Sequence, residues 1–469
     1  MNNADWPAFQ SECNARTSLF DDEITALLHD FKHDRWTPNT RARIQKLAPD
    51  LQAAILGSAM SGVGKVSITP KYSPVKSHWW TPKVDELIAE KRLAHNAWCS
   101  EKRKSKKMKL KDKYDALSSN LTRYTEILRR SHWQKFCNRF ENPKQIYALL
   151  QRSRGSSSIP SFFAFPGGPP CTSDAEKATA FNNGYGKIGT AEAKDHDNKF
   201  RNSVKRELKD RRSKGLLSQH RWLHYEAFNQ STSAANVRTV LRGLRKKGAP
   251  GIDGLTNAFL SRLPELTIKR LASFFKLSLA AGVFPDVWKV AVLFPIPKSN
   301  KAPIVATDMR PIALLSCLGK AFERVVHSSI VDWVETAGIL PPEQVGFIKG
   351  KSTTVHLSSI TQQYRSNLRG NKFTLSVDFD IKKAYNSVWC DGLIYKMIRL
   401  NFPPAMVRFI DSWLSNRNYI TRLGADSSAS IEYSRGVPQG SVLSCVLFNI
   451  FLAISLRTLN ATVSCTLMT

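Results

Sequence analysis

Residues 373–388 read Phe373-Thr-Leu-Ser-Val-Asp-Phe-Asp380-Ile-Lys-Lys-Ala-Tyr385-Asn-Ser-Val388. Over the first half, apolar and polar side chains alternate, and this period of two predicts a strand with one buried face. From Ile381 onward the apolar residues recur at helical intervals, so the strand is expected to lead into a helix. The polar face ends in two carboxylates, Asp378 and Asp380. A carboxylate at such a strand end can hold a metal ion or can simply cap the following helix.

A second stretch predicts a glycine- and proline-rich turn that leads into an apolar helix. It reads Ser434-Arg-Gly436-Val-Pro-Gln-Gly440-Ser-Val-Leu-Ser-Cys-Val-Leu-Phe448-Asn-Ile-Phe451. Gly436 and Gly440 allow backbone to approach a ligand closely, and Gln439 between them offers both a donor and an acceptor.

These two motifs, in this order, resemble motifs A and B of the reverse transcriptases of non-LTR (LINE-type) retrotransposons, closest to the jockey-like elements. Residues 248–256, with Gly-Ala-Pro-Gly-Ile-Asp-Gly, and residues 344–353 are similar to two further family signatures. The resemblance is close from about residue 236 to the end and loose over residues 70–235. It implies an α+β fold with right-hand polymerase fingers and an incomplete palm, preceded by a mostly helical basic N-terminal region. The implied function is RNA-directed DNA polymerase, a nucleotidyltransferase of a transposable element.

The resemblance also assigns roles to individual residues. Asp380 would be the catalytic residue and a metal ligand, with the carbonyl of Ile381 beside it. Tyr385 would be a steric gate that selects dNTP over rNTP, although helix packing is the alternative role for its ring. Gln439 and Gly440 would form the floor under the nascent base pair.

A hairpin upstream carries two candidate triphosphate ligands. Residues 288–298 predict a strand that ends in prolines, and residues 308–315 predict its return. Lys298 and Arg310 would offer phosphate oxygens a point charge and a planar fork; the alternative is that they are ordinary exposed charges. In the signature at 344–353, Ile348 replaces the usual Arg, and Lys349 and Lys351 are the candidate nucleic-acid contacts there.

The catalytic mechanism implied by the resemblance needs a second set of carboxylates. Two-metal nucleotide transfer uses carboxylates from two strands to hold two Mg²⁺ ions. The family supplies the second set from a Tyr-Ala-Asp-Asp motif soon after the position of Phe451, and the sequence ends at Thr469 without it. We therefore expect a truncated copy without a thumb, at most weak Mg²⁺ binding, and defective catalysis.

The last five residues suggest how the motif was lost. If these residues were encoded by TGT-ACG-CTG-ATG-AC, the same letters read two bases along would encode Tyr-Ala-Asp-Asp. One hypothesis is a frameshift within about residues 453–464; a partial gene sequence is the other. A non-catalytic nucleic-acid-binding remnant or domesticated fragment is the alternative function.

Charge supports a polyanionic partner. The chain has 69 Lys and Arg against 38 Asp and Glu, a formal net charge of +31. This excess of positive charge favours binding to nucleic acid, which releases counterions. The alternative is a generic basic surface. Residues 83–141 predict a long basic helical region with interleaved aromatics, either a phosphate-binding face or a solvated helix. Its candidate nucleic-acid ligands are Lys102, Arg103, Lys104, Lys106 and Lys107.

Three regions are expected along the chain. Residues 1–70 form a helical N-terminal remnant, residues 71–235 a basic helical region between a missing endonuclease and the polymerase, and residues 236–469 the polymerase fingers and palm. No apolar run reaches the length of a membrane span, and no signal peptide is visible. Eight cysteines without a Cys-x-x-Cys pair suggest a reducing compartment. We expect an intracellular protein of the cytoplasm or nucleus, not secreted, whose partners are an RNA template, a DNA primer and dNTPs, with no membrane.

Overall fold

The computed structural model of the chain separates into two compact units, residues 68–158 and residues 1–67 with 159–469. It describes residues 5–33, 38–63, 81–101, 103–137, 163–164, 170–171, 173–190, 198–213, 226–246, 248–297, 309–342, 344–376, 381, 383–424 and 426–457. Nothing in the described ranges forms a helix both long enough and apolar enough to cross a bilayer.

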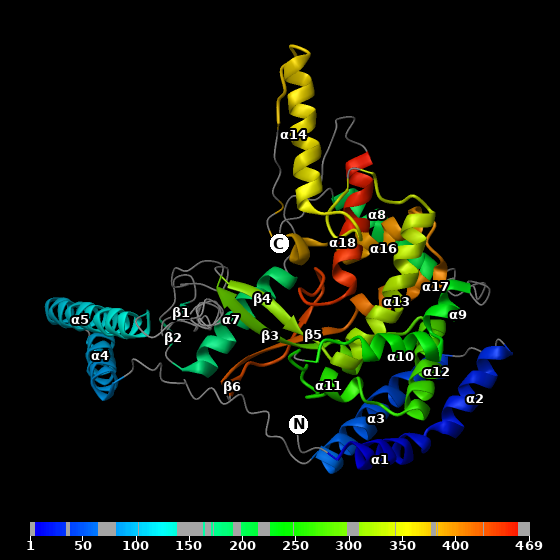
Figure 1. Ribbon diagram of the computed structural model, residues 1–469, viewed down its shortest axis with the longest axis horizontal. Helices are drawn as coiled ribbons and strands as arrows, with labels where there is room; N and C mark the ends of the chain where they lie inside the picture. Colours follow the sequence, from blue (N-terminus) through cyan, green and yellow to red (C-terminus); the bar gives the residue numbers. More distant parts are fainter. Residues whose placement is uncertain are drawn as a thin grey trace. The chain divides into compact units, whose positions relative to one another are not determined.

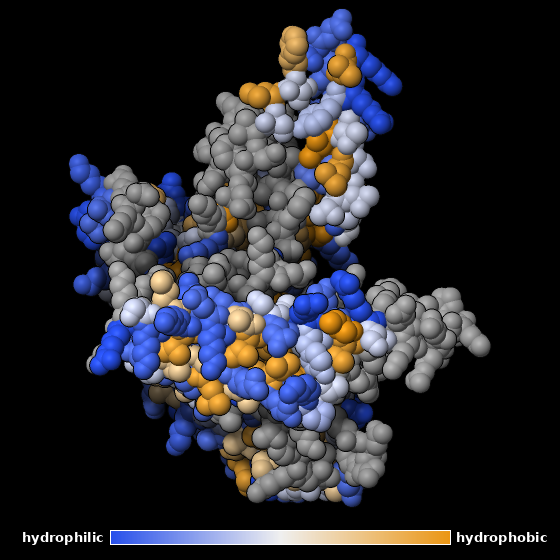
Figure 2. Space-filling view, turned by 90° about the vertical axis from the view of Figure 1, so that its left-hand side faces the viewer, coloured by the Kyte–Doolittle hydropathy of each residue, from blue (hydrophilic) through white to orange (hydrophobic). Residues whose placement is uncertain are grey.

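The described residues of the smaller unit form two helices, α4 (Pro82–Ser100) and α5 (Lys104–Cys137), that contact each other. The helical prediction for residues 83–141 is confirmed over the described residues, but the helix is interrupted between α4 and α5, where Glu101 takes an extended conformation. The ring of Trp98 stacks on Tyr114 at 5.6 Å, so these two aromatics hold the pair together. Hydrophilic side chains dominate α5, in the foreground of Figure 2.

Three N-terminal helices belong to the larger unit: α1 (Trp6–Ser18), α2 (Asp21–Lys32) and α3 (Pro38–Val63) (blue in Figure 1). In α2 the apolar residues Ile24, Leu27 and Phe31 recur at helical spacing and are buried. These helices pack against α12 (Glu265–Ala281) and share one hydrophobic core with it.

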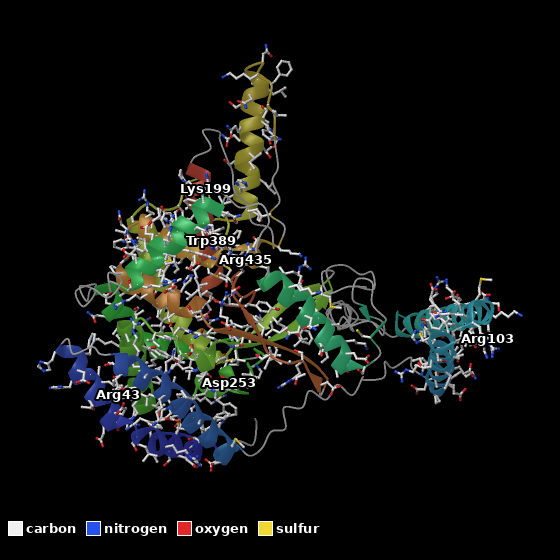
Figure 3. The ribbon with its side chains drawn as sticks, turned by 180° about the vertical axis from the view of Figure 1, so that it is seen from behind. Arg43, Arg103, Lys199, Asp253, Trp389 and Arg435 are labelled. Atoms are coloured by element: carbon white, nitrogen blue, oxygen red, sulfur yellow. The ribbon has the colours of Figure 1, made fainter. Side chains whose placement is uncertain are left out.

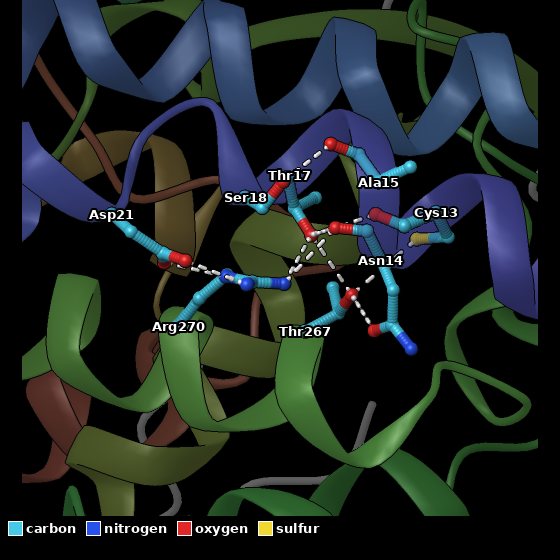
Figure 4. A network of polar contacts seen from close by, with 8 residues as sticks. All are labelled: Cys13, Asn14, Ala15, Thr17, Ser18, Asp21, Thr267 and Arg270. Atoms are coloured by element: carbon cyan, nitrogen blue, oxygen red, sulfur yellow. Dashed lines mark hydrogen bonds and ion pairs between the residues drawn. The ribbon is translucent and has the colours of Figure 1, made fainter.

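Polar contacts also join α1 and α2 to α12 (Figure 4). Arg270 donates to both carboxylate oxygens of Asp21, at 2.6 and 2.7 Å, and the hydroxyls of Thr17 and Thr267 are 3.0 Å apart. The guanidinium of Arg270 holds the pKa of Asp21 below its usual range. The N-terminal helices are therefore fixed to the body of the unit by charge-assisted hydrogen bonds as well as by apolar packing.

A five-stranded sheet lies at the centre of the larger unit. Its strand order is β4-β3-β5-β6, with β7 also paired to β5. The predicted hairpin is confirmed, because β3 and β4 are antiparallel, while β3 and β5 are parallel. The strands are β3 (Val290–Pro297), β4 (Met309–Leu314), β5 (Arg417–Leu423), β6 (Asp426–Ser427) and β7 (Ile431–Tyr433).

Helices surround this sheet. On one side, Phe181 and Tyr185 of α7 (Asp174–Thr190) join a small core with the strands. The larger core gathers α13 (Cys317–Thr336), α17 (Pro404–Leu414) and α18 (Leu443–Arg457) with α12. This mixture of helices and sheet confirms the α+β class. The remaining elements are β1 (Phe163–Ala164), β2 (Pro170–Cys171), α8 (Asn198–Ser213), α9 (Glu226–Ser231), α10 (Ala234–Arg242), α11 (Asn257–Leu260), η2 (Asp286–Trp288), α14 (Thr353–Arg369), α15 (Ala384–Ser387) and α16 (Cys390–Arg399).

The strand predicted at residues 373–380 is wrong for its first four residues. Phe373 and Leu375, expected on a buried face, are 106% and 89% exposed. The segment runs back beside the projecting helix α14 (Figure 1), where Asn367 Nδ2 donates to Thr374 Oγ1 at 3.1 Å. No described strand pairs with it, so its apolar face has no sheet to be buried against. Residues 377–380 lie outside the described residues.

The helix predicted from Ile381 is also shorter than expected. Only the four residues of α15 are helical, and Lys383 precedes them in the left-handed region with φ 54°. Ile381 is 43% exposed instead of lying on an apolar helical face.

Candidate nucleotide site

The glycine-rich turn at residues 434–442 lies directly against α15. Val437 N donates to the carbonyl of Tyr385 at 2.8 Å, and Gly436 N donates to the carbonyl of Val388 at 2.8 Å. Gly436 has φ 75°, and a Cβ at this position would lie 2.7 Å from Asn386 Cα. Only glycine satisfies both constraints, so the turn and α15 are fixed to each other through backbone.

The far end of the turn is joined to the sheet. Ala313 N, on β4, donates to the carbonyl of Gln439 at 2.8 Å. Gly440 has φ 136°, and a Cβ there would collide with the carbonyl oxygen of Ala313. Gln439 lines a small pocket together with Ala313, Asn386 and Gly436, so residues from β4, α15 and the turn meet at one place.

Tyr385 faces α18. Its hydroxyl lies 3.4 Å from Cys445 Sγ, and its ring centroid lies 5.4 Å from that of Phe448. Partial burial, followed by the contact with Cys445, raises the pKa of Tyr385, which keeps the phenol neutral. The ring therefore packs on α18 at the edge of the site, next to the turn.

The buried carboxylate of Glu323, which the sequence did not indicate, holds the C-terminal end of the glycine-rich turn. Glu323, on α13, accepts hydrogen bonds from Ser441 Oγ at 2.7 Å, from Val442 N at 2.8 Å and from Trp413 Nε1 at 2.9 Å. Burial raises the pKa of Glu323, and the hydrogen bonds oppose the rise. The only sequence signal was an acidic residue at a core-facing position of an apolar helical pattern.

Arg417, at the start of β5, holds the other side of the turn. It is buried and donates to the carbonyls of Gly436 at 2.7 Å, Leu414 at 2.9 Å and Arg435 at 3.2 Å. Arg435 itself, labelled in Figure 3, donates to the carbonyl of Ser387. No sequence pattern indicated that Arg417 would serve the turn.

The loop at 344–351 is tied to α18. Gln344 Nε2 donates to Asn449 Oδ1 at 3.1 Å, and Asn449 Nδ2 donates to the carbonyl of Gly346 at 2.9 Å. Lys351 Nζ donates to the carbonyls of Gln344 and Pro342 at 2.8 and 2.7 Å, so its ammonium group is used within the loop. Lys349 is exposed.

The other predicted ligands are placed only in part. Arg310 is exposed on β4, and Lys298 and Asp380 lie outside the described residues. In the smaller unit, Arg103 (labelled in Figure 3), Lys106 and Lys107 are exposed. The structure does not describe Lys102 or the side chain of Lys104.

The described residues supply no metal-ligand set of their own. Nowhere among them do three or more His, Cys, Asp or Glu side chains gather closely enough to hold a metal ion. Asp380, the carboxylate predicted for this role, is outside the described ranges, so the metal site stays a prediction.

Comparison with known proteins defines the class of this domain. Residues 296–469 match the family described as reverse transcriptase (RNA-dependent DNA polymerase). The matched segment includes β4, α15 and the glycine-rich turn, the elements that form the site.

Three relatives narrow the class. Over 213 residues the chain is 34% identical to "Probable RNA-directed DNA polymerase from transposon BS" of Drosophila melanogaster, covering 45% of this chain and 23% of that protein. It is 32% identical over 215 residues to "RNA-directed DNA polymerase from mobile element jockey" of the same species, covering 46% and 23%. The identity is 31% over 221 residues to "Retrovirus-related Pol polyprotein from type-1 retrotransposable element R2" of Popillia japonica, covering 46% and 29%.

These matches confirm the resemblance found in the motifs: the C-terminal part of the chain is of the non-LTR, jockey-like reverse transcriptase kind. The aligned segment spans about a quarter of the length of these curated relatives.

Proposed function

We propose that residues 236–469 form the fingers and palm of an RNA-directed DNA polymerase, which adds dNTPs to a DNA primer on an RNA template. The observation that carries this proposal is the backbone contact between α15 and the turn, where Val437 bonds Tyr385 and Gly436 bonds Val388. It brings the segment that follows Asp380 beside Gln439, as a shared nucleotide pocket requires.

In this proposal the described side chains select and position the nucleotide. Tyr385, held against Cys445 and Phe448, limits the space beside the sugar and so disfavours a ribose 2′-hydroxyl. Gln439 and Gly440 form the floor under the base pair, because Gly440 allows the backbone there to lie against β4.

The charged groups complete the proposed site. Asp380, with the carbonyl of Ile381, would hold Mg²⁺, which supplies charge neutralisation on the triphosphate when bound. Lys298 and Arg310 would contact the triphosphate oxygens, since a planar guanidinium and an ammonium group suit phosphate.

The remaining regions fit the proposal as nucleic-acid contacts. We assign residues 1–70 to a helical N-terminal region and residues 71–235 to a basic helical region that contacts the template. Lys349, an exposed residue of the 344–351 loop, is a further nucleic-acid ligand. RNA, a DNA primer and dNTPs are the proposed partners, and the cytoplasm or nucleus is the proposed location.

The exposed basic surface of α5 favours a second candidate function, nucleic-acid binding without catalysis. Lys106, Lys107 and Lys109 project from this helix into solvent. Primer extension on an RNA template separates this alternative from polymerase activity.

Nucleotide selection tests the polymerase proposal even if extension is slow. We expect the chain, with an RNA template, a DNA primer and Mg²⁺, to bind dATP more tightly than ATP in a competition assay. Tyr385→Ala should narrow this preference by roughly tenfold or more, because the ring no longer excludes the 2′-hydroxyl. Tyr385→Phe should keep it.

Tyr364→Ala, which removes a 43% exposed tyrosine of α14, is the control and should leave selectivity unchanged. If Tyr385→Ala lowers stability but leaves the ratio of dATP to ATP affinity as in the wild type, the ring only packs the core and the proposal fails.

A further inference from the structure

A second pocket lies away from the nucleotide site, where α3, the turn after α12, α8 and α17 meet. Its volume is about 390 Å³. The elements around it are held by direct bonds: Phe284 N donates to Ser412 Oγ at 3.0 Å, and Asp286 N donates to Gln45 Oε1 at 2.9 Å. The pocket is therefore built into the packing of the unit.

Arg408 is the central side chain of this pocket. It is only 7% exposed, yet its Nε and Nη2 atoms have no hydrogen-bond partner among the described residues. Its aliphatic part lies across Gly282, where a Cβ would come within 2.7 Å of Arg408 Cβ, so glycine is required for this placement. A buried guanidinium with unused donors is costly unless an acceptor satisfies it.

The other charges of the pocket do not supply that acceptor. Asp411 pairs with Arg212 at 2.6 Å, and Asp286 pairs with Lys289 at 2.7 Å. Both carboxylates are thus occupied by a cation of their own. Arg408 has Arg41 as its charged neighbour, and burial together with this like charge lowers the pKa of Arg408 to about 10.

We propose that this pocket binds a phosphate group, with the guanidinium groups of Arg408 and Arg41 as its ligands. Phosphate matches the site because its oxygens accept paired N–H bonds from a planar guanidinium, and its charge offsets the excess of two cations. The proposal does not depend on polymerase activity. The phosphate can be free or part of a nucleic-acid backbone, and the experiment distinguishes these sources.

Thermal unfolding of the full chain with increasing inorganic phosphate, at an ionic strength held constant with NaCl, tests the site. A ligand that binds the folded state raises Tm. We therefore expect Tm to increase with phosphate concentration and not to increase when chloride replaces phosphate at the same ionic strength. Arg408→Met should weaken the apparent phosphate affinity by roughly 10- to 100-fold, the range for charge-assisted hydrogen bonds. Without phosphate it should be at least as stable as the wild type, since an unpaired buried charge has been removed.

Two further variants keep the result interpretable. Arg41→Met removes an exposed side chain and should weaken the phosphate response in part, and Arg324→Met, exposed on α13, should leave it unchanged. The proposal would be overturned if phosphate did not raise the Tm of the wild type more than chloride does. It would also be overturned if phosphate raised the Tm of Arg408→Met and of Arg41→Met as much as that of the wild type.

A second arm identifies the source of the phosphate with single-stranded RNA. If Arg408→Met, already shown to lose the phosphate response, binds RNA more weakly than Arg324→Met does, the ligand is a backbone phosphate. If the two variants, which have equal net charge, bind RNA equally, the ligand is a free phosphate group. Either result supports the site.

Discussion

Two glycines, Gly436 and Gly440, make the candidate nucleotide site possible. Gly436 and Gly440 let the turn touch α15 and β4 through backbone, and Arg417 and Glu323 then hold the turn from either side. Each of these contacts joins parts of the chain that are distant in sequence.

Gly436→Ala should destabilise the chain more than a glycine replacement that only strains the backbone. Gly254→Ala is the matched control, because Gly254 has φ 70° and a Cβ added there would have no atom within 4 Å. We expect Gly436→Ala to cost about 1–3 kcal/mol more than Gly254→Ala in denaturant unfolding, owing to overlap with Asn386. Equal costs would mean that the close contact between turn and α15 is absent.

Glu323 gives a pH dependence with a definite sign. Its folded-state pKa is raised by burial, so its contribution to stability is complete below the ordinary value of 4.5 and is lost as the pH rises through the raised pKa. Glu323→Gln cannot ionise and should lack this loss. The free energy of unfolding of the wild type relative to Glu323→Gln should therefore fall as the pH rises from about 4 toward neutrality.

The control for this experiment is Glu335→Gln, an exposed position on the same helix. A wild-type curve that stays parallel to that of Glu323→Gln across the same pH range would show that Glu323 is not buried as described.

The sequence anticipated the glycines but not their partners. It predicted close backbone approach at Gly436 and Gly440, and the structure shows that each approaches the protein's own backbone. Glu323 could not be connected to the turn from sequence, because Ser441 lies 118 residues further along the chain. Such contacts depend on the packed fold and leave no local pattern.

At the level of elements, α5 is the clearest candidate for binding a nucleic-acid backbone. Replacing three of its exposed lysines by Gln should weaken the salt dependence of single-stranded RNA binding. The slope of log binding constant against log salt concentration should become less steep by about two. The positions are Lys106, Lys107 and Lys109.

A variant with the same change in net charge on α8 is the control. It replaces the exposed residues Lys205, Arg206 and Lys209 by Gln. If both triple variants reduce the slope equally, binding follows net charge alone and α5 is not a specific contact surface.

Local patterns were sufficient for some elements and not for others. The β3–β4 hairpin was predicted, because two apolar runs and flanking prolines specify it locally. Residues 373–376 have an equally regular alternation and are not a strand in the structure, because a strand also needs a paired neighbour. The break between α4 and α5 was missed, since residues 101–103 contain no proline or glycine to mark it.

At the level of the whole molecule, the N-terminal helices belong to the same compact unit as the reverse transcriptase segment. Thr17 and Thr267 meet across 250 residues of sequence, and Arg270 bonds Asp21 across a similar separation. The sequence predicted that residues 1–70 are helical but not which part of the chain these helices pack against. The phosphate pocket that we propose also depends on this union, because Arg41 comes from α3.

The central claim is that Asp380 and the glycine-rich turn face each other across one metal-dependent pocket, and iron-directed backbone cleavage tests it most directly. With Mg²⁺ replaced by Fe²⁺, in the presence of ascorbate and peroxide, we predict cuts both within residues 377–388 and within residues 434–440. Added Mg²⁺ and Asp380→Asn should suppress both sets. Cuts at only one segment, or cuts that persist unchanged in Asp380→Asn, would contradict the account.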